Sequence, residues 1–111
     1  MPIIINAENV RAARQGAGWV EYTLANTDII GAPAMVASRW VFEPGARGPE
    51  LIHGDTSQLL YVIRGSGSAC VEGEALPLAV ESVLWLEPGE QVQFVAGDKG
   101  LEILQGYAPG E

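Results

Sequence analysis

Glycine and proline residues divide this sequence into short apolar runs, and this spacing of turn-forming residues constrains the fold more than any other feature. The chain has 111 residues, of which 14 are glycine and 7 are proline. Turn signals that recur roughly every 8–12 residues leave little room for long helices but suit short β-strands. The pattern therefore predicts an all-β fold, either a closed barrel or a sandwich.

The expected strands are runs rich in β-branched and aromatic residues between those turns. They cover residues 3–5, 19–24, 34–42, 58–63, 68–72, 82–86, 91–96 and 101–107. Turns are expected at residues 26–33, 43–45, 64–67, 73, 87–89 and 97–100, the last of these a hairpin turn. One short helical segment is expected from Asn6, a suitable N-cap, through Ala13, with its end near Gly16.

Composition and charge limit the classes of partner that this chain can bind. Apolar residues make up 48% of it, and 111 residues suffice for one domain with its own core. The formal net charge of −8 opposes binding to phosphate backbones and anionic lipid, so we expect no nucleic-acid and no membrane partner. The N-terminal Met-Pro-Ile-Ile-Ile-Asn lacks the basic region and long apolar core of a signal peptide, which favours a cytoplasmic protein.

The single cysteine, Cys70, limits redox and metal chemistry. One cysteine cannot form a disulfide within the chain, and it cannot provide a zinc site built from cysteines alone. A reactive thiol needs a cationic neighbour, and Arg64 is the only one near Cys70 in the sequence. We therefore interpret Cys70 as a small buried hydrophobic residue.

The turn residues and the histidine within residues 45–65 resemble the first motif of the cupin family. In that motif a glycine is followed after five residues by His-x-His, then by a glutamate, and six residues later by a glycine. Here Gly45, His53 and Gly65 keep their places at the same intervals. Leu51 stands where the motif has its first histidine, and Gln58 where it has the glutamate.

Residues 81–94 resemble the second cupin motif, a glycine followed by Pro-x-Gly, a histidine and an aromatic residue. Residues 87–89, Glu-Pro-Gly, fill the Pro-x-Gly place, and Phe94 fills the aromatic place. Glu81 stands where the motif has glycine, and Val92 where it has histidine. The resemblance implies a small single-domain cupin over residues 1–111 with degenerate metal-binding motifs. Its fold would be a double-stranded β-helix, or jelly-roll barrel.

A typical cupin holds a divalent metal such as Fe, Mn, Ni or Zn with three imidazoles and a carboxylate. Two of the four corresponding positions are aliphatic here, so His53 and Gln58 are the metal-binding candidates that remain. If a metal binds, Asp55, Glu50 or a group from another strand would have to supply the missing charge. We therefore expect no metal cofactor, with a metal-dependent, dioxygenase-like activity on an atypical ligand set as the alternative.

His53, the only histidine of the chain, is the main catalytic candidate. It is either a barrel histidine retained for hydrogen bonding or a general acid/base in a metal-free pocket, since imidazole titrates near neutral pH. Asp55 would orient it if the strand continues that far, because residues i and i+2 share a face. The resemblance supports this pair, because sugar epimerases with cupin-like barrels use a histidine and an aspartate without metal. Asp55, beside Gly54, is otherwise a turn residue.

The remaining site candidates follow from the same alignment. Gln58 is expected inside the barrel, bonded internally, for instance to His53, or in contact with a polar ligand atom. Leu51, Leu60, Val92 and Phe94 either fill the core or line an apolar pocket for a flat or aromatic ligand. Trp40, Tyr61, Trp85 and Tyr107 are aromatic candidates for its wall or rim. Arg39 faces the cavity if Trp40 faces outward, and is otherwise solvated; Glu102 has the same two alternatives.

Two classes of function remain open from the sequence. One is a metal-independent isomerase, cyclase, epimerase or lyase with His53 as acid/base, and short cupins of polyketide biosynthesis suggest an aromatic or polyketide-like substrate. The other is a non-catalytic cupin that binds a small ligand or has a structural role.

A homodimer is also expected, because small barrels often pair through an edge strand or an outer sheet face, and the Ile3–Ile5 run is an apolar edge.

Overall fold

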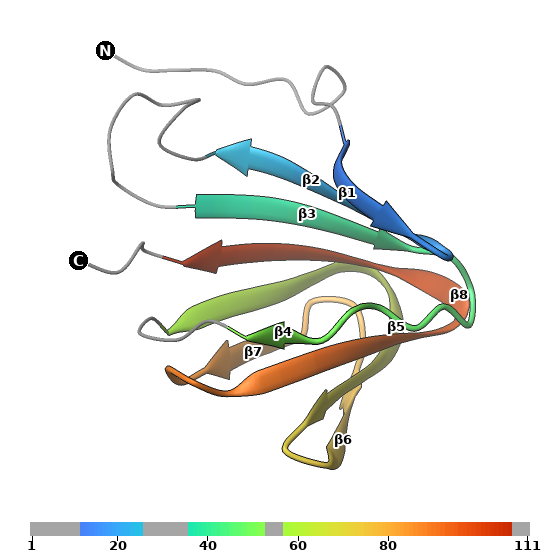
Figure 1. Cartoon of the computed structure of the whole chain (residues 1–111). Coiled ribbons are helices and arrows are strands. Elements are labelled where there is room, and N and C mark those ends of the chain that lie inside the picture. Colours follow the sequence, from blue (N-terminus) through green and yellow to red (C-terminus); the bar gives the residue numbers. More distant parts are fainter. Residues whose placement is uncertain (1–11, 26–35, 53–56, 108–111) are drawn as a thin grey trace.

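The structure is a computed structural model, and it describes residues 12–25, 36–52 and 57–107. These residues form eight β-strands and no helix (Figure 1). The strands are β1 (Ala12–Gly16), β2 (Trp19–Ala25), β3 (Val36–Phe42), β4 (Leu51–Ile52), β5 (Gln58–Val71), β6 (Glu74–Leu78), β7 (Val83–Leu86) and β8 (Gln91–Tyr107). No helix in this part of the chain is long and apolar enough to cross a membrane.

All strand pairs are antiparallel, and the main order is β1-β2-β3-β8-β5-β6. The first half of β5 pairs with β7 and with the end of β8, which also pairs with β3. The second half of β5 pairs with β6 and with the start of β8, which also pairs with β4. Two sheets therefore share their two central strands, which confirms the predicted all-β double-stranded β-helix.

The predicted breaks at residues 64–67 and 97–100 are wrong. Both segments lie within the long strands β5 and β8, which curve from one sheet into the other (Figure 1). Gly65 pairs with Leu101 and Gly67 with Ala96, so residues 97–100 of β8 form an irregularity between two paired positions, and the register also shifts between Val62 and Arg64. Glycine-rich segments resemble turns locally, but here they bend a strand without ending it.

Gly65 shows why the bend requires glycine. Its φ is 83°, in the left-handed region, and a Cβ at this position would overlap the backbone carbonyl of Gly100 on the neighbouring strand. Two backbones thus approach each other where β5 passes β8. Only a residue without a side chain permits this approach.

The predicted helical segment is wrong where the structure describes it. Residues 12–16 form strand β1, which pairs with β2, and all five of its residues are exposed. Gly18, with φ of 79°, allows the tight connection between the two strands. A hairpin therefore replaces the expected end of the helix. The rest of that segment and the Ile3–Ile5 strand lie outside the described residues.

The remaining strand predictions agree with the structure, apart from two short strands that were missed. Strands β2, β3 and β7 match the predicted runs, and turns occur at Gly45 and Gly89 as expected. β4 was missed because it has only two residues. β6 was missed because Pro77 interrupts its pattern, although proline is compatible with an edge strand such as this one.

Glu81 adopts a backbone conformation that is unusual for its residue type. Its φ is 70°, in the left-handed region, at the position where the second cupin motif has glycine. Its backbone N–H donates to the carbonyl of Val62, and the next residue, Ser82, accepts a hydrogen bond from the Val62 N–H. The turn thus keeps the backbone shape that glycine favours, although glutamate occupies the position.

Gly65→Ala and Gly73→Ala separate torsional strain from steric overlap. Both glycines have left-handed φ values, 83° and 80°, but a Cβ at Gly73 meets no atom within 4 Å. We expect Gly73→Ala to lower the free energy of unfolding by about 1 kcal/mol, the cost of the torsion alone. Gly65→Ala should lower it by about 3 kcal/mol or more, because backbone atoms must also move. Denaturant titrations measure both; equal losses would contradict the close approach of β5 and β8.

Candidate binding site inside the barrel

Side-chain alternation on the strands determines what faces the barrel interior. On β3, Ser38, Trp40 and Phe42 are buried while their neighbours are only partly buried. On β8, Val92 and Phe94 are buried in the same alternating way, as the sequence predicted. The interior is therefore lined by residues from both sheets, and the two sheets differ in the polarity of the side chains they contribute.

The apolar part of the interior contains the residues predicted to line a pocket. Leu51, Leu60, Val92 and Phe94 are all buried and belong to one hydrophobic cluster. Leu51 and Val92 are directly paired across β4 and β8, so two of the positions that hold metal in a typical cupin are adjacent hydrocarbon side chains. Trp40, another predicted lining residue, is fully buried in the same cluster.

A hydrogen-bonded chain of three buried side chains crosses the first sheet inside the barrel. The indole Nε1 of Trp40 donates to Gln105 Oε1 at 2.8 Å, and Gln105 Nε2 donates to Gln58 Oε1 at 2.6 Å. Trp40, Gln105 and Gln58 are 0%, 2% and 1% exposed, on the neighbouring strands β3, β8 and β5. The inward orientation expected for Gln58 is thus observed, and its side-chain oxygen accepts a hydrogen bond from Gln105.

The direction of this chain follows from the chemistry of indole. A tryptophan N–H can only donate, so the oxygen of Gln105 must face it and the Gln105 nitrogen must face Gln58. The oxygen of Gln58 is then the acceptor. The side-chain nitrogen of Gln58 is then turned away from Gln105, and an amide nitrogen can only donate.

The described residues at the cupin ligand positions do not fit a resident metal ion. Leu51 and Val92 carry no donor atom, and the only potential ligand atom of Gln58 accepts the hydrogen bond from Gln105. Glu50, a proposed substitute, is exposed and bonds to Gln91. Across the described ranges, no three His, Cys, Asp or Glu side chains lie together as a metal site requires. His53 and Asp55 lie outside these ranges.

Charged and phenolic groups lie near the amide chain, and the sequence analysis did not select two of them, Arg14 and Glu21. Glu21 is paired in register with buried Trp40 and forms an ion pair of 2.7 Å with Arg14. The Arg14 guanidinium lies 5.4 Å from the centre of the Trp40 ring. Burial raises the pKa of Tyr107, the negative charge of Glu21 raises it further, and Arg14 opposes the shift. These residues give the barrel a polar region beside its apolar one.

Gln105 was also missed, although a signal for it exists in the sequence. It lies two positions after Ile103, so strand alternation places both on the same face. Ile103 is fully buried and so is Gln105. A buried amide requires a buried partner, but the sequence does not show which strand would provide it.

Arg39 and Glu102 lie on the outer face of the first sheet. Because Trp40 faces inward, its neighbour Arg39 faces the other way, and the condition for a cavity-facing Arg39 is not met. Arg39 Nε donates to Glu102 at 2.8 Å and stacks on Tyr22, while Arg64 pairs with the same carboxylate at 3.1 Å. The hydrogen bond to Glu102 raises the pKa of Arg39.

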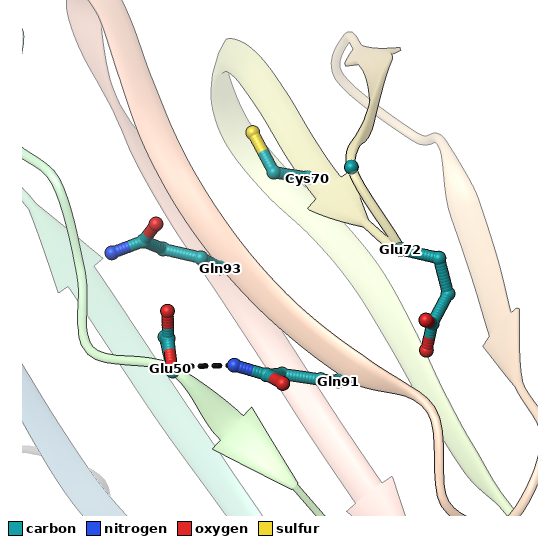
Figure 2. A pocket seen from close by; sticks show the side chains of 6 residues that line it. Glu50, Cys70, Glu72, Gln91 and Gln93 are labelled. Atoms are coloured by element: carbon teal, nitrogen blue, oxygen red, sulfur yellow. Dashed lines mark hydrogen bonds between the residues drawn. The ribbon is translucent and has the colours of Figure 1, made fainter.

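A separate hollow lies on the outer face of the second sheet (Figure 2). It has a volume of about 400 Å³ and is lined by Glu50, Cys70, Glu72, Gly73, Gln91 and Gln93. Gln91 and Gln93 alternate with buried Val92, so this hollow is outside the barrel. Gln91 bonds to Glu50, and Gln93 bonds to the carbonyl of Gly48. Cys70 is only partly buried here, which corrects its predicted full burial.

Comparison with known proteins supports the assignment of the fold. No family model and no curated protein matches this chain. It is similar to a predicted oxalate decarboxylase from Thermotoga maritima, at 17% identity and a TM-score of 0.82 over 96% of this chain and 98% of that one. It is also similar to an RmlC-like cupin from Shewanella frigidimarina, at 21% identity and a TM-score of 0.77 over 96% of this chain and 89% of that one.

A third similar structure is the polyketide cyclase RemF from Streptomyces resistomycificus. It is 20% identical, with a TM-score of 0.78 over 96% of this chain and 79% of that one. Likeness at this level of identity defines the fold, and it extends over nearly the whole chain. The protein is therefore a small cupin-fold protein, as the resemblance to the two cupin motifs implied.

Gln105→Leu tests the buried hydrogen-bonded chain. The substitution leaves the Trp40 N–H and the Gln58 oxygen without their partner in a dry interior, at a cost of about 1–3 kcal/mol for each group. We expect the free energy of unfolding to fall by about 2–4 kcal/mol in a denaturant titration. Gln91→Leu, the same change in the outer hollow, should cost less than about 1 kcal/mol because water replaces its lost bond. Equal losses would mean that the buried chain has no special role.

Proposed function

We propose that this cupin-fold protein binds a small organic molecule inside its barrel and holds an oxygen atom of that ligand with the side-chain nitrogen of Gln58. The observation that carries the proposal is the fixed direction of the Trp40–Gln105–Gln58 chain. The Gln58 nitrogen can only donate, and an oxygen atom of a ligand can accept its hydrogen bond. The donor would select carbonyl, carboxylate or ether oxygens over groups that only donate.

The surroundings of Gln58 favour a ligand that is mostly apolar. Leu51, Val92 and Phe94 are buried hydrocarbon side chains in the same interior. A pocket lined by such side chains would bind flat or aromatic molecules through apolar contact and use a few polar groups for orientation. An aromatic or polyketide-like ketone matches this combination, and the similar structure of a polyketide cyclase is consistent with it.

We further propose that the bound ketone undergoes proton transfer, with His53 as the acid/base. A neutral imidazole would take a proton from the carbon beside the carbonyl, and the Gln58 donor would stabilise the enolate oxygen that forms. Return of the proton to another atom gives isomerisation, and its return to the opposite face of the same carbon gives epimerisation. Attack of the enolate carbon on a second carbonyl of the ligand, whose oxygen then takes the proton, gives cyclisation. Loss of a leaving group from the neighbouring carbon gives a lyase reaction. Asp55 would orient the imidazole. His53 is proposed because it is the only histidine of the chain.

A non-catalytic, ligand-binding cupin is the second candidate. The observation that favours it is the hydrocarbon pair Leu51 and Val92 at two positions where typical cupins hold their metal. Such a protein would bind the same class of ligand, and the Gln58 donor would serve recognition alone. The two candidates therefore share the binding site and differ only in the role of His53.

Gln58→Glu tests the proposed donor with a pair of probe molecules. Acetophenone and isopropylbenzene have nearly the same shape, but only acetophenone has an oxygen acceptor. We expect wild-type protein to bind acetophenone about 2–10 times more tightly, which is the effect of one hydrogen bond of about 0.5–1.5 kcal/mol. Gln58→Glu keeps the shape but replaces the donor with an oxygen, so the preference should disappear. Ligand-observed NMR titrations measure all four affinities.

Gln93→Glu is the matched control for this substitution, because it makes the same change on the outer face of the second sheet. It should retain the preference for acetophenone. Equal affinity of the wild-type protein for the two probes would contradict the role of Gln58, and so would an unchanged preference in Gln58→Glu.

His53→Asn distinguishes the catalytic candidate from the binding candidate. Proton transfer beside a carbonyl exchanges the methyl protons of acetophenone for deuterium in D₂O, and ¹H NMR follows the loss of their signal. If His53 is the base, wild-type protein should accelerate this exchange above the buffer rate, and His53→Asn should lower that acceleration about 100-fold or more. Binding of acetophenone should survive the substitution. Exchange that is undiminished in His53→Asn would exclude His53 as the base.

A further inference from the structure

The outer face of the first sheet carries a group of exposed apolar side chains. They are Leu59, Tyr61 and Ile63 on β5, Val83 and Trp85 on β7, and Leu104 on β8; we call this group the apolar face. Trp85 and Val83 are each 61% exposed and Leu59 is 44% exposed. Large apolar side chains this accessible on adjacent strands indicate an interaction surface.

Strand register shows that the apolar face is continuous. Leu59 is paired with Trp85 on one side and with Gly106 on the other. In the next row, Tyr61 is paired with Val83 and with Leu104. Side chains of paired residues are neighbours on one face of a sheet. The apolar face therefore extends without interruption across β7, β5 and β8.

The size of the apolar face is suited to a protein partner. From their exposed fractions, its six side chains present on the order of 500 Å² of surface, given the areas of roughly 150–250 Å² that large side chains bury. A stable interface buries about 800 Å² on each partner, with a polar rim around an apolar centre. The apolar face would supply most of such an interface, and the adjacent charged residues would supply its rim.

The charge beside this face permits a second copy of the chain as the partner. The chain has a net charge of −8, so two copies repel each other over most of their surfaces. On this face the carboxylate of Glu102 is paired with Arg39 and Arg64, which leaves a local charge of +1 from these three residues. This local charge is small, so two copies that meet here repel each other less than they would through strongly acidic surfaces.

The shape of the face is also self-complementary. One row runs from Trp85 through Leu59 and Gly106 to Ala37 on β3. It has the largest side chain at one end and two of the smallest at the other. A two-fold axis through the middle of this row exchanges its ends, so the indole of each copy meets the small residues of the other.

We propose that the apolar face is the interface of a homodimer with two-fold symmetry, in which Trp85 of one copy packs over the Gly106–Ala37 end of the other. The proposal specifies which face mediates dimerisation, and it does not depend on the ligand proposed for the barrel. Burial of six apolar side chains per copy drives association, and the Arg39–Glu102–Arg64 group borders the interface.

Sedimentation equilibrium over a wide range of protein concentration tests this interface. Wild-type protein should have twice the 11.8 kDa mass of the chain, and Trp85→Glu should have the mass of one chain. The substituted carboxylate would be buried against an apolar surface, which weakens association strongly. Leu59→Glu, in the same row, should have the same effect. Both residues are exposed in the single chain, so circular dichroism and the unfolding temperature should change little.

Ala75→Glu is the matched control, because it adds the same charge at an exposed position of β6 in the other sheet. It should remain a dimer. A wild-type chain that is monomeric at every concentration overturns the proposal, since another partner would then cover the face. A dimer that persists in both Trp85→Glu and Leu59→Glu overturns it as well, as does a dimer lost equally in Ala75→Glu.

Discussion

The indole N–H of Trp40 sets the polarity of the barrel interior. Because this group can only donate, it fixes the orientation of Gln105 and, through Gln105, that of Gln58. The oxygen of the amide at a cupin ligand position is thereby engaged by Gln105, and its nitrogen is the group turned away from that contact. One residue on β3 thus influences the orientation of a side chain on β5, two strands away in the sheet.

The same strand also links the interior to the outer surface. Alternation along β3 places Trp40 inside, and it therefore places Arg39 outside, where it joins Glu102 and Arg64. This charged group lies beside the apolar side chains of the same sheet face. The proposed binding site and the proposed interface are thus two faces of one sheet, and a one-residue shift of β3 would alter both.

The sequence predicted the fold and part of the site for physical reasons that can be identified. Turn residues act locally, so the strands followed from their spacing, and the resemblance to the cupin motifs implied the inward positions of Leu51, Gln58 and Val92. The continuity of β5 and β8 did not, because it depends on contact between Gly65 and Gly100, which are distant in the sequence. The partner of Gln58 was missed for the same reason. Secondary-structure propensity is a property of one segment of the sequence. A hydrogen bond between two strands depends on their register, which no single segment determines.

The sharing of β5 and β8 between both sheets affects how this chain folds. Arg39 and Glu102 are 63 positions apart, and their strands meet only after most of the chain has been ordered. Closing such long loops costs entropy before any contact repays it, so folding is slow compared with that of a helical protein of this size. Because β5 and β8 belong to both sheets, separating these two strands removes pairing from both sheets at once. We therefore expect the two halves of the barrel to unfold together.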